Sequence, residues 1–211
     1  MGARTLGVVL FDRFELLDVF GPLEIFGVLK NHFEIVVIGP PDGYVASSQG
    51  PRSVVDVAYA GAPRCDVVLV PGGLGTRSLV DDGEFIGWLG DWASKAELVT
   101  SVCTGSGVLA RAGLLDGYRA TSNKRDFAFA VSQGPLVEWV PSARWVADRD
   151  RWTSSGVAAG MDMALALVAH LHGEQLATAV ANAIELDWHR DSSWDPFAVL
   201  NGLVDGEQTQ D

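Results

Sequence analysis

The sequence predicts an α/β fold in which a mostly parallel sheet is covered by helices on both faces. Short β-rich apolar runs alternate with longer stretches of helical periodicity through most of the 211 residues, which is typical of parallel strands joined by crossover helices. Several of these runs are apolar at nearly every position, as expected for strands buried on both faces. Two pairs of short runs predict hairpins, so the sheet is expected to be mixed at its margins.

The predicted elements follow one another in a regular order. Strands are expected over residues 5–11, 33–38, 66–70 and 98–102. Helices are expected over residues 16–29, 78–95, 104–115, 157–172 and 174–188, with Gly173 between the last two. The hairpins pair 44–48 with 53–57 and 144–147 with 151–154. This order predicts one domain over residues 1–204 and a polar tail over 205–211 that lacks apolar periodicity.

Composition and charge narrow the classes of partner. Hydrophobic residues make up 48% of the chain and charged residues 20%, enough apolar material for a substantial core. The formal net charge of −12 opposes binding to a phosphate backbone. No apolar run reaches the roughly 20 residues of a membrane helix. With two cysteines and no export signal, the expected location is the cytoplasm, with both thiols free and neither nucleic acid nor membrane as a partner.

Cys103 is the leading candidate for a reactive group, because it lies where a predicted strand meets a predicted helix. In a nucleophile elbow the residues two before and two after the nucleophile are small, and here they are Ser101 and Gly105. The helix N-terminus is expected to favour the thiolate by lowering the thiol pKa. The alternative is a buried cysteine that packs as a small hydrophobic side chain.

A glycine-rich turn, Pro71-Gly72-Gly73-Leu74-Gly75, follows the strand predicted over 66–70. It lacks the spacing of a dinucleotide fingerprint and the lysine of a phosphate loop. The backbone N–H groups of Gly73 and Thr104 are candidates for an oxyanion hole beside the elbow. The alternative is a tight βα turn that needs glycine for its dihedral angles.

Asp18 lies in an apolar segment just after the first predicted strand, where burial would raise the pKa of its carboxyl and fit it for proton transfer. Glu24, further along the same predicted helix, is a second candidate for this role. A helix cap at Gly21-Pro22 is the structural alternative for Asp18. The histidines and cysteines lack zinc spacing, so no metal ion is expected.

Six segments in order resemble the ThiJ/PfpI superfamily, and among its branches they are most similar to the isonitrile (isocyanide) hydratases. They occupy residues 17–22, 45–50, 70–73, 100–105, 112–117 and 155–162. The resemblance implies a flavodoxin-like three-layer sandwich and a homodimer. It also implies cysteine-dependent conversion of an isocyanide to an N-substituted formamide without a cofactor. In this scheme Cys103 is the nucleophile, Asp18 moves the proton, Thr104 is a donor beside the sulfur, and Gly73 completes the oxyanion site.

One position departs from the family pattern. After residues 119–122, where many relatives carry a histidine, this chain has Asn123. An asparagine cannot exchange a proton, so a Cys–His hydrolase is disfavoured more than a Cys–Asp hydratase. Asn123 and Glu24 are therefore candidates for the substrate pocket.

The alternative functions are a glyoxalase-like or amide-hydrolysing enzyme, and a redox-sensing regulator without enzymatic activity. Some relatives continue into a DNA-binding helix-turn-helix domain, for which no basic extension is seen here.

Overall fold

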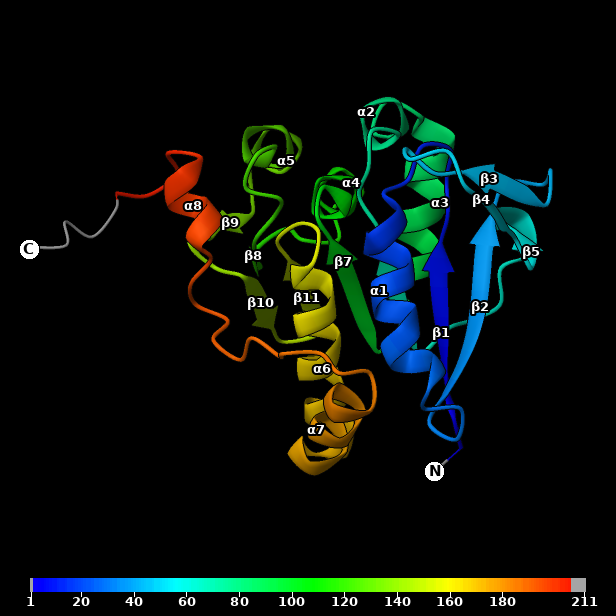
Figure 1. Cartoon of the computed structure of the whole chain (residues 1–211). Helices are drawn as coiled ribbons and strands as arrows, with labels where there is room; N and C mark the ends of the chain where they lie inside the picture. The colour runs from blue at the N-terminus through cyan, green and yellow to red at the C-terminus, as the bar shows by residue number, and fades with distance from the viewer. Residues whose placement is uncertain (1, 206–211) are drawn as a thin grey trace, which may run out of the picture.

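A computed structural model describes residues 2–205 and centres on a seven-stranded sheet (Figure 1). Its strands lie in the order β10-β11-β7-β6-β1-β2-β5. Adjacent strands are parallel except β10 and β11, which form an antiparallel hairpin at one edge. The bounds are β1 Arg4–Val9, β2 Phe33–Gly39, β5 Val57–Ala58, β6 Val67–Val70, β7 Leu98–Val102, β10 Trp145–Asp148 and β11 Arg151–Ser154. The predicted parallel sheet with a mixed margin is therefore confirmed.

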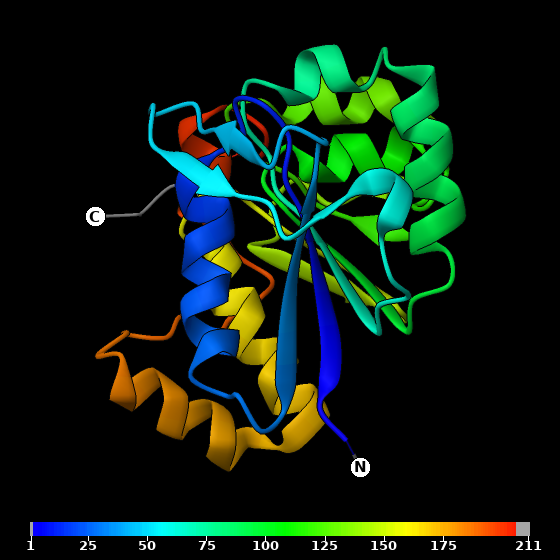
Figure 2. The same ribbon diagram turned by 90° about the vertical axis from the view of Figure 1, so that its right-hand side faces the viewer.

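Helices cover both faces of this sheet, as Figure 2 shows. One face carries α1 (Leu16–Gly27), α6 (Ala159–His172) and α7 (Glu174–Ala183). The other carries α2 (Thr76–Leu79), α3 (Gly83–Ala93), α4 (Gly105–Arg111) and α5 (Phe127–Gln133). The result is the flavodoxin-like three-layer sandwich that the resemblance implied.

Smaller elements surround the main sheet. Strands β3 (Tyr44–Ala46) and β4 (Arg52–Val54) form the predicted hairpin, and β8 (Arg119–Ala120) pairs with β9 (Glu138–Trp139). A 3-10 turn, η1, spans Tyr59–Gly61, and a short helix, α8, spans Pro196–Leu200. No helix among residues 2–205 is long and apolar enough to cross a membrane.

Several predicted boundaries were wrong, for local reasons. The helix predicted over 78–95 is two helices, because Asp82 caps a new helix by accepting hydrogen bonds from the N–H groups of Glu84 and Phe85 at 3.1 and 3.0 Å. The helix predicted over 104–115 ends at Arg111, shortly before Gly113 with φ +72°. The helix predicted over 174–188 ends at Ala183, near Glu185 with φ +54°. Apart from Asp205, the predicted tail lies outside the described residues.

The core positions the candidate site at one end of the sheet. Strands β6 and β7 are buried at every position, and their carboxyl ends point the same way because they are parallel. The turn after β6 and the elbow after β7 therefore meet at this end, and α1, which follows β1, begins beside them (Figure 1). Ligands of open parallel sheets commonly bind outside these carboxyl ends.

Candidate active site

Cys103 occupies a strained turn between β7 and α4. Its φ of +59° is in the left-handed region, which costs a residue with a side chain about 1–3 kcal/mol. The surroundings hold it there, because the hydroxyls of Ser106 and Ser122 donate to the Cys103 carbonyl at 3.1 and 3.0 Å. Such strain is found at reactive positions, where it holds a side chain out of the regular backbone path. Cys103 therefore occupies the predicted strand-to-helix turn, and its role as a nucleophile stays a prediction.

The elbow tolerates no side chain two residues after the cysteine. A Cβ at Gly105 would lie 2.2 Å from the carbonyl oxygen of Val70 and 2.7 Å from that of Pro71. Ser101, two residues before, is fully buried. Close packing against the end of β6 therefore explains why both positions carry small residues.

Asp18 lies beneath the sulfur, in the first turn of α1. It is fully buried, and its Oδ2 accepts a hydrogen bond from the Gly72 N–H at 2.8 Å. Its Oδ1 has no hydrogen-bond partner in the described chain, and the Cys103 thiol lies close enough to the carboxyl to influence its pKa. Residue 15, not Asp18, takes the N-cap position, so the cap interpretation of Asp18 was wrong.

The pKa of Asp18 is raised well above its usual value. Burial is the largest cause, and the nearby charge of Glu15 adds to it. The Gly72 N–H and the Cys103 thiol act in the opposite direction but do not compensate. Asp18 can therefore hold a proton at pH values at which an exposed carboxyl has lost it.

The pKa of the Cys103 thiol is also raised well above its usual value, against the expectation of a lowered one. Burial is the largest cause, followed by the negative charge of Asp18. Hydrogen bonds from Thr104 and Asn123 lower the pKa, but by less. The favourable helix N-terminus was visible in the sequence, whereas the burial of the sulfur was not. Cys65 is buried elsewhere, and its pKa is raised to about 11.

Thr104 contacts the sulfur through both its backbone N–H and its hydroxyl. Its Oγ1 accepts a hydrogen bond from the Gly73 N–H at 3.1 Å. Gly73 is thus adjacent to the site, but its N–H is engaged by Thr104. An oxyanion role for Gly73 stays a prediction, and it requires this N–H to exchange the threonine for substrate.

Asn123 approaches Cys103 from the opposite side, through the segment after β8. Its side-chain amide hydrogen-bonds to the sulfur, while its Oδ1 accepts from the Asp126 N–H at 3.0 Å. Gly156 closes this side, because a Cβ there would lie 2.0 Å from Asn123 Nδ2 and 3.1 Å from Cys103 Sγ. Gly156 was not among the predicted site residues, because its role depends on contacts between distant segments.

A pocket of about 400 Å³ opens beside Asn123 and Gly156. Lys124 also lines it; this buried side chain donates to Thr121 Oγ1 at 2.7 Å, and burial lowers its pKa to about 8. Sequence reasoning missed Lys124 because a lysine is expected at the surface. Glu24, in contrast, is exposed on α1 and does not line this pocket.

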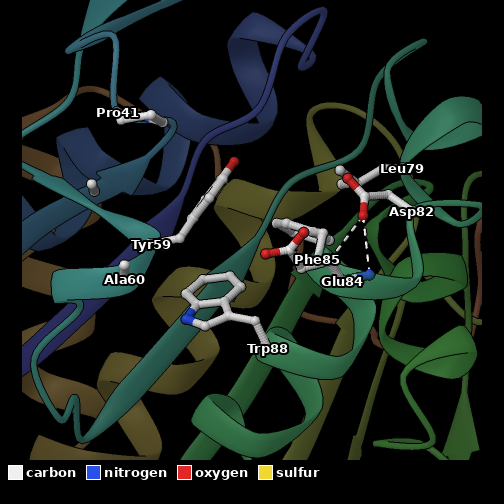
Figure 3. A pocket seen from close by; sticks show the side chains of 9 residues that line it. Pro41, Tyr59, Ala60, Leu79, Asp82, Glu84, Phe85 and Trp88 are labelled. Atoms are coloured by element: carbon white, nitrogen blue, oxygen red, sulfur yellow. Dashed lines mark hydrogen bonds between the residues drawn. The ribbon is translucent and has the colours of Figure 1, made fainter.

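A separate pocket of about 360 Å³ lies by β5 and α3 and is drawn in Figure 3. Its wall includes the rings of Tyr59, Phe85 and Trp88, with Asp82 and Glu84 across from Tyr59. It contains none of the predicted site residues. Within residues 2–205, no group of three or more His, Cys, Asp or Glu side chains is arranged to hold a metal ion.

Comparison with known proteins gives this geometry a family. The model of the DJ-1/PfpI family matches residues 4–170, which include the elbow, Asp18 and Asn123. The chain belongs to the DJ-1/PfpI family. Isonitrile hydratase from Pseudomonas putida is 33% identical over 185 residues, which cover 87% of this chain and 78% of that protein. The structure of a ThiJ/PfpI family protein from Pseudomonas syringae is 34% identical with a TM-score of 0.79, covering 89% of this chain and 76% of that one.

Regulators carry related domains in this family. The HTH-type transcriptional regulator GbdR from Pseudomonas aeruginosa is 32% identical over 183 residues. The match covers 84% of this chain but 49% of the regulator, so the chain spans about half the length of that relative. The DJ-1/PfpI family therefore includes both an enzyme and transcriptional regulators at similar identity to this chain.

Proposed function

We propose that this DJ-1/PfpI protein is a cysteine-dependent isonitrile hydratase, a lyase that converts an isocyanide to an N-substituted formamide. The observation that carries the proposal is the buried contact between the Cys103 thiol and the Asp18 carboxyl. Burial raises the pKa of each group, and in the proposed resting state the coupled pair shares one proton, with Cys103 as the thiol and Asp18 as the carboxylate. A sulfur nucleophile and a proton donor thus share one water-poor site.

The chemistry follows from the position of one proton. Its transfer from the Cys103 sulfur to Asp18 leaves a thiolate beside a neutral carboxylic acid. The thiolate attacks the terminal carbon of R–N≡C, and Asp18 protonates that carbon, which gives the thioimidate R–N=CH–S–Cys103. Such positioned proton transfer typically contributes about 10²–10⁴-fold to a rate.

Hydrolysis of the thioimidate then restores the enzyme. Asp18, now a carboxylate, accepts a proton from water as the water oxygen bonds to the same carbon, and passes this proton to the substrate nitrogen. The proton of the new hydroxyl then moves to the departing sulfur. The C–S bond breaks, the product R–NH–CHO leaves, and the thiol is regenerated. One isocyanide and one water give one formamide, so the reaction needs no cofactor.

The neighbours of the sulfur support the charged stages of this sequence. Thr104 and Asn123 donate hydrogen bonds to Cys103, which stabilise the thiolate before attack and after product release. Asn123 has no proton to exchange in this scheme, and none is required of it. We also propose a homodimer as the working unit. A cytoplasmic location is supported by two free cysteines.

A second candidate is a sensor in which Cys103 is chemically modified and does not catalyse turnover of a substrate. The similarity to GbdR favours it, because that relative is a transcriptional regulator. The raised pKa of Cys103 counts against a sensor that relies on rapid oxidation of a thiolate. A glyoxalase-like or amide-hydrolysing enzyme would use the same sulfur on a carbonyl carbon.

The deciding experiment measures turnover of p-nitrophenyl isocyanide, with formamide detected as the product. Wild type should be active, Cys103→Ala inactive, and Asp18→Asn reduced by about 10²–10⁴-fold, since it removes the proton donor. Glu24→Gln, a matched change on the exposed side of α1, should retain activity. Inactive wild type overturns the hydratase, and methylglyoxal turnover or ligand-dependent modification of Cys103 then separates the remaining functions. Equal activity of wild type and Asp18→Asn refutes the assignment of Asp18.

A further inference from the structure

The charged side chains that line the pocket beside Asn123 and Gly156 all carry the same sign of charge. Its charged residues are Lys124, Arg125 and Arg144, and no acidic residue lines it. This is unexpected for a chain with a net charge of −12. The pocket by β5 and α3 has the opposite lining, with Asp82 and Glu84 and no basic residue (Figure 3). A concave site lined by one sign of charge attracts ligands of the other sign.

Of the three cations, Arg125 is the one free to bind a ligand. Arg144 is paired with Asp162, with N···O contacts of 2.6 and 2.8 Å. Lys124 is hydrogen-bonded to Thr121 Oγ1 and to the carbonyls of Ala143 and Ser122. Arg125 is exposed and forms no ion pair within the described part of the chain. Arg125 follows Asn123 by two residues and lines the same pocket. Its positive charge therefore lies near the Asn123 amide, which is a neighbour of the Cys103 sulfur.

The rest of the lining is mainly apolar, and its two largest apolar side chains come from α8. Phe197 and Leu200 line the pocket although they are 50% and 77% exposed. The start of α8 is held in place, because the buried Asp195 accepts from the Phe197 N–H at 3.1 Å and its own N–H donates to Ser142 O at 2.7 Å. The apolar side chains are therefore positioned over the pocket by the fold.

We infer that this pocket selects substrates with an apolar, preferably aromatic, body and an anionic group such as a carboxylate. The inference rests on the proposed hydratase for the reacting end of the molecule. The isocyanide carbon meets Cys103 next to Asn123 and Gly156, the body of the R group lies against Phe197 and Leu200, and Arg125 neutralises the anionic group. Arg125 and Phe197 are thus specificity-determining residues.

The test compares two isocyanides of similar shape, 4-isocyanobenzoate and the neutral p-tolyl isocyanide. Wild type should show a kcat/KM about fivefold higher for the carboxylate, the size expected of one partly exposed ion pair, and 0.5 M salt should reduce this preference. Arg125→Gln should abolish the preference, whereas the matched control Arg64→Gln, which alters an exposed arginine outside this pocket, should retain it. Phe197→Ala should raise KM for both substrates. Equal kcat/KM values in wild type, or loss of preference in Arg64→Gln, overturn the inference.

Binding of the two product amides makes this test independent of turnover. In calorimetry wild type should bind 4-formamidobenzoate more tightly than 4-methylformanilide, and Arg125→Gln should bind them equally. If wild type hydrates no isocyanide but keeps this preference, the proposed function fails and the inferred pocket stands. If isocyanides are hydrated and neither assay shows a preference for the anion, the hydratase stands and the inference fails.

Discussion

The Asp18 carboxyl and the Cys103 thiol meet in one buried site, although one lies on α1 and the other at the start of α4. The thiol lowers the pKa of Asp18, while the charge of Asp18 raises the pKa of Cys103. The ionisation of each group therefore depends on the other, and the pair titrates as a unit. Most of the predictions below concern this pair and the turn that holds it.

Asp18→Asn should make the Cys103 thiol more acidic, because it removes the negative charge that raises the thiol pKa. The measurement is the rate of iodoacetamide alkylation of Cys103 against pH, with Cys65 distinguished by peptide mass analysis. The midpoint for Cys103 should move to lower pH, and that for Cys65 should stay in place. Glu24→Gln removes one charge from the exposed side of α1 and should leave both midpoints unchanged. A higher pH midpoint for Cys103 alkylation in Asp18→Asn would show that the carboxylate assists ionisation of the thiol.

Asp18 should also make stability depend on pH. Its pKa is raised in the folded state, so it contributes stability that is fully present below the unfolded-state pKa of about 4 and is lost as the pH rises through the folded-state value. An asparagine at position 18 does not titrate, so the variant does not lose stability in this way. The Tm of Asp18→Asn minus that of wild type should therefore increase between pH 4 and pH 8. A constant difference across this range would contradict the raised pKa.

Gly105→Ala should severely destabilise the protein, because the new methyl group would lie 2.2 Å from the Val70 carbonyl oxygen. Such overpacking against backbone costs at least about 1–3 kcal/mol. Gly87→Ala is the matched control within α3, where nothing lies within 4 Å of the added Cβ. It should stabilise by about 0.5–1 kcal/mol through its higher helix propensity. Denaturant unfolding checks both values, and a stable Gly105→Ala would refute the packing of the elbow.

Asn123→Leu should raise the pKa of the Cys103 thiol, because it removes a hydrogen-bond donor to the sulfur. The shape of the side chain is nearly kept, so the change is chiefly electrostatic. Alkylation of Cys103 at fixed pH should become slower. Faster or unchanged alkylation would indicate that the Asn123 amide does not stabilise the thiolate.

The proposed homodimer should use the exposed side of α1. Leu17, Phe20 and Val28 are 40%, 46% and 47% exposed, and their spacing places them on one side of the helix. Sedimentation of wild type at micromolar concentration should therefore show twice the 22.5 kDa of one chain. Phe20→Asp should convert the dimer to the monomer, because a charge would be buried in an apolar contact. A wild-type monomer would refute this assembly.

Sequence patterns predicted the main strands and the elbow, but fewer of the contacts around it. β7 was predicted with its observed bounds, since its apolar and β-branched residues favour a buried strand. Helix α5 and strands β8 and β9 were missed, because elements this short depend on tertiary packing. Lys124 was missed because its burial depends on partners brought together by the fold.

The sequence by itself determined the layered fold and the elbow. Period-2 and period-3.6 patterns are local properties, and so is the spacing of Ser101, Cys103 and Gly105 at the elbow. Only the tertiary structure decided the chemistry of the site. The pKa of Cys103 is raised because the surrounding core excludes water from it and because the negative charge of Asp18 lies nearby. The pocket beside Asn123 is basic because segments around Arg125 and Arg144 meet there. Burial and charge are sums over neighbours in space, and a linear pattern does not contain those neighbours.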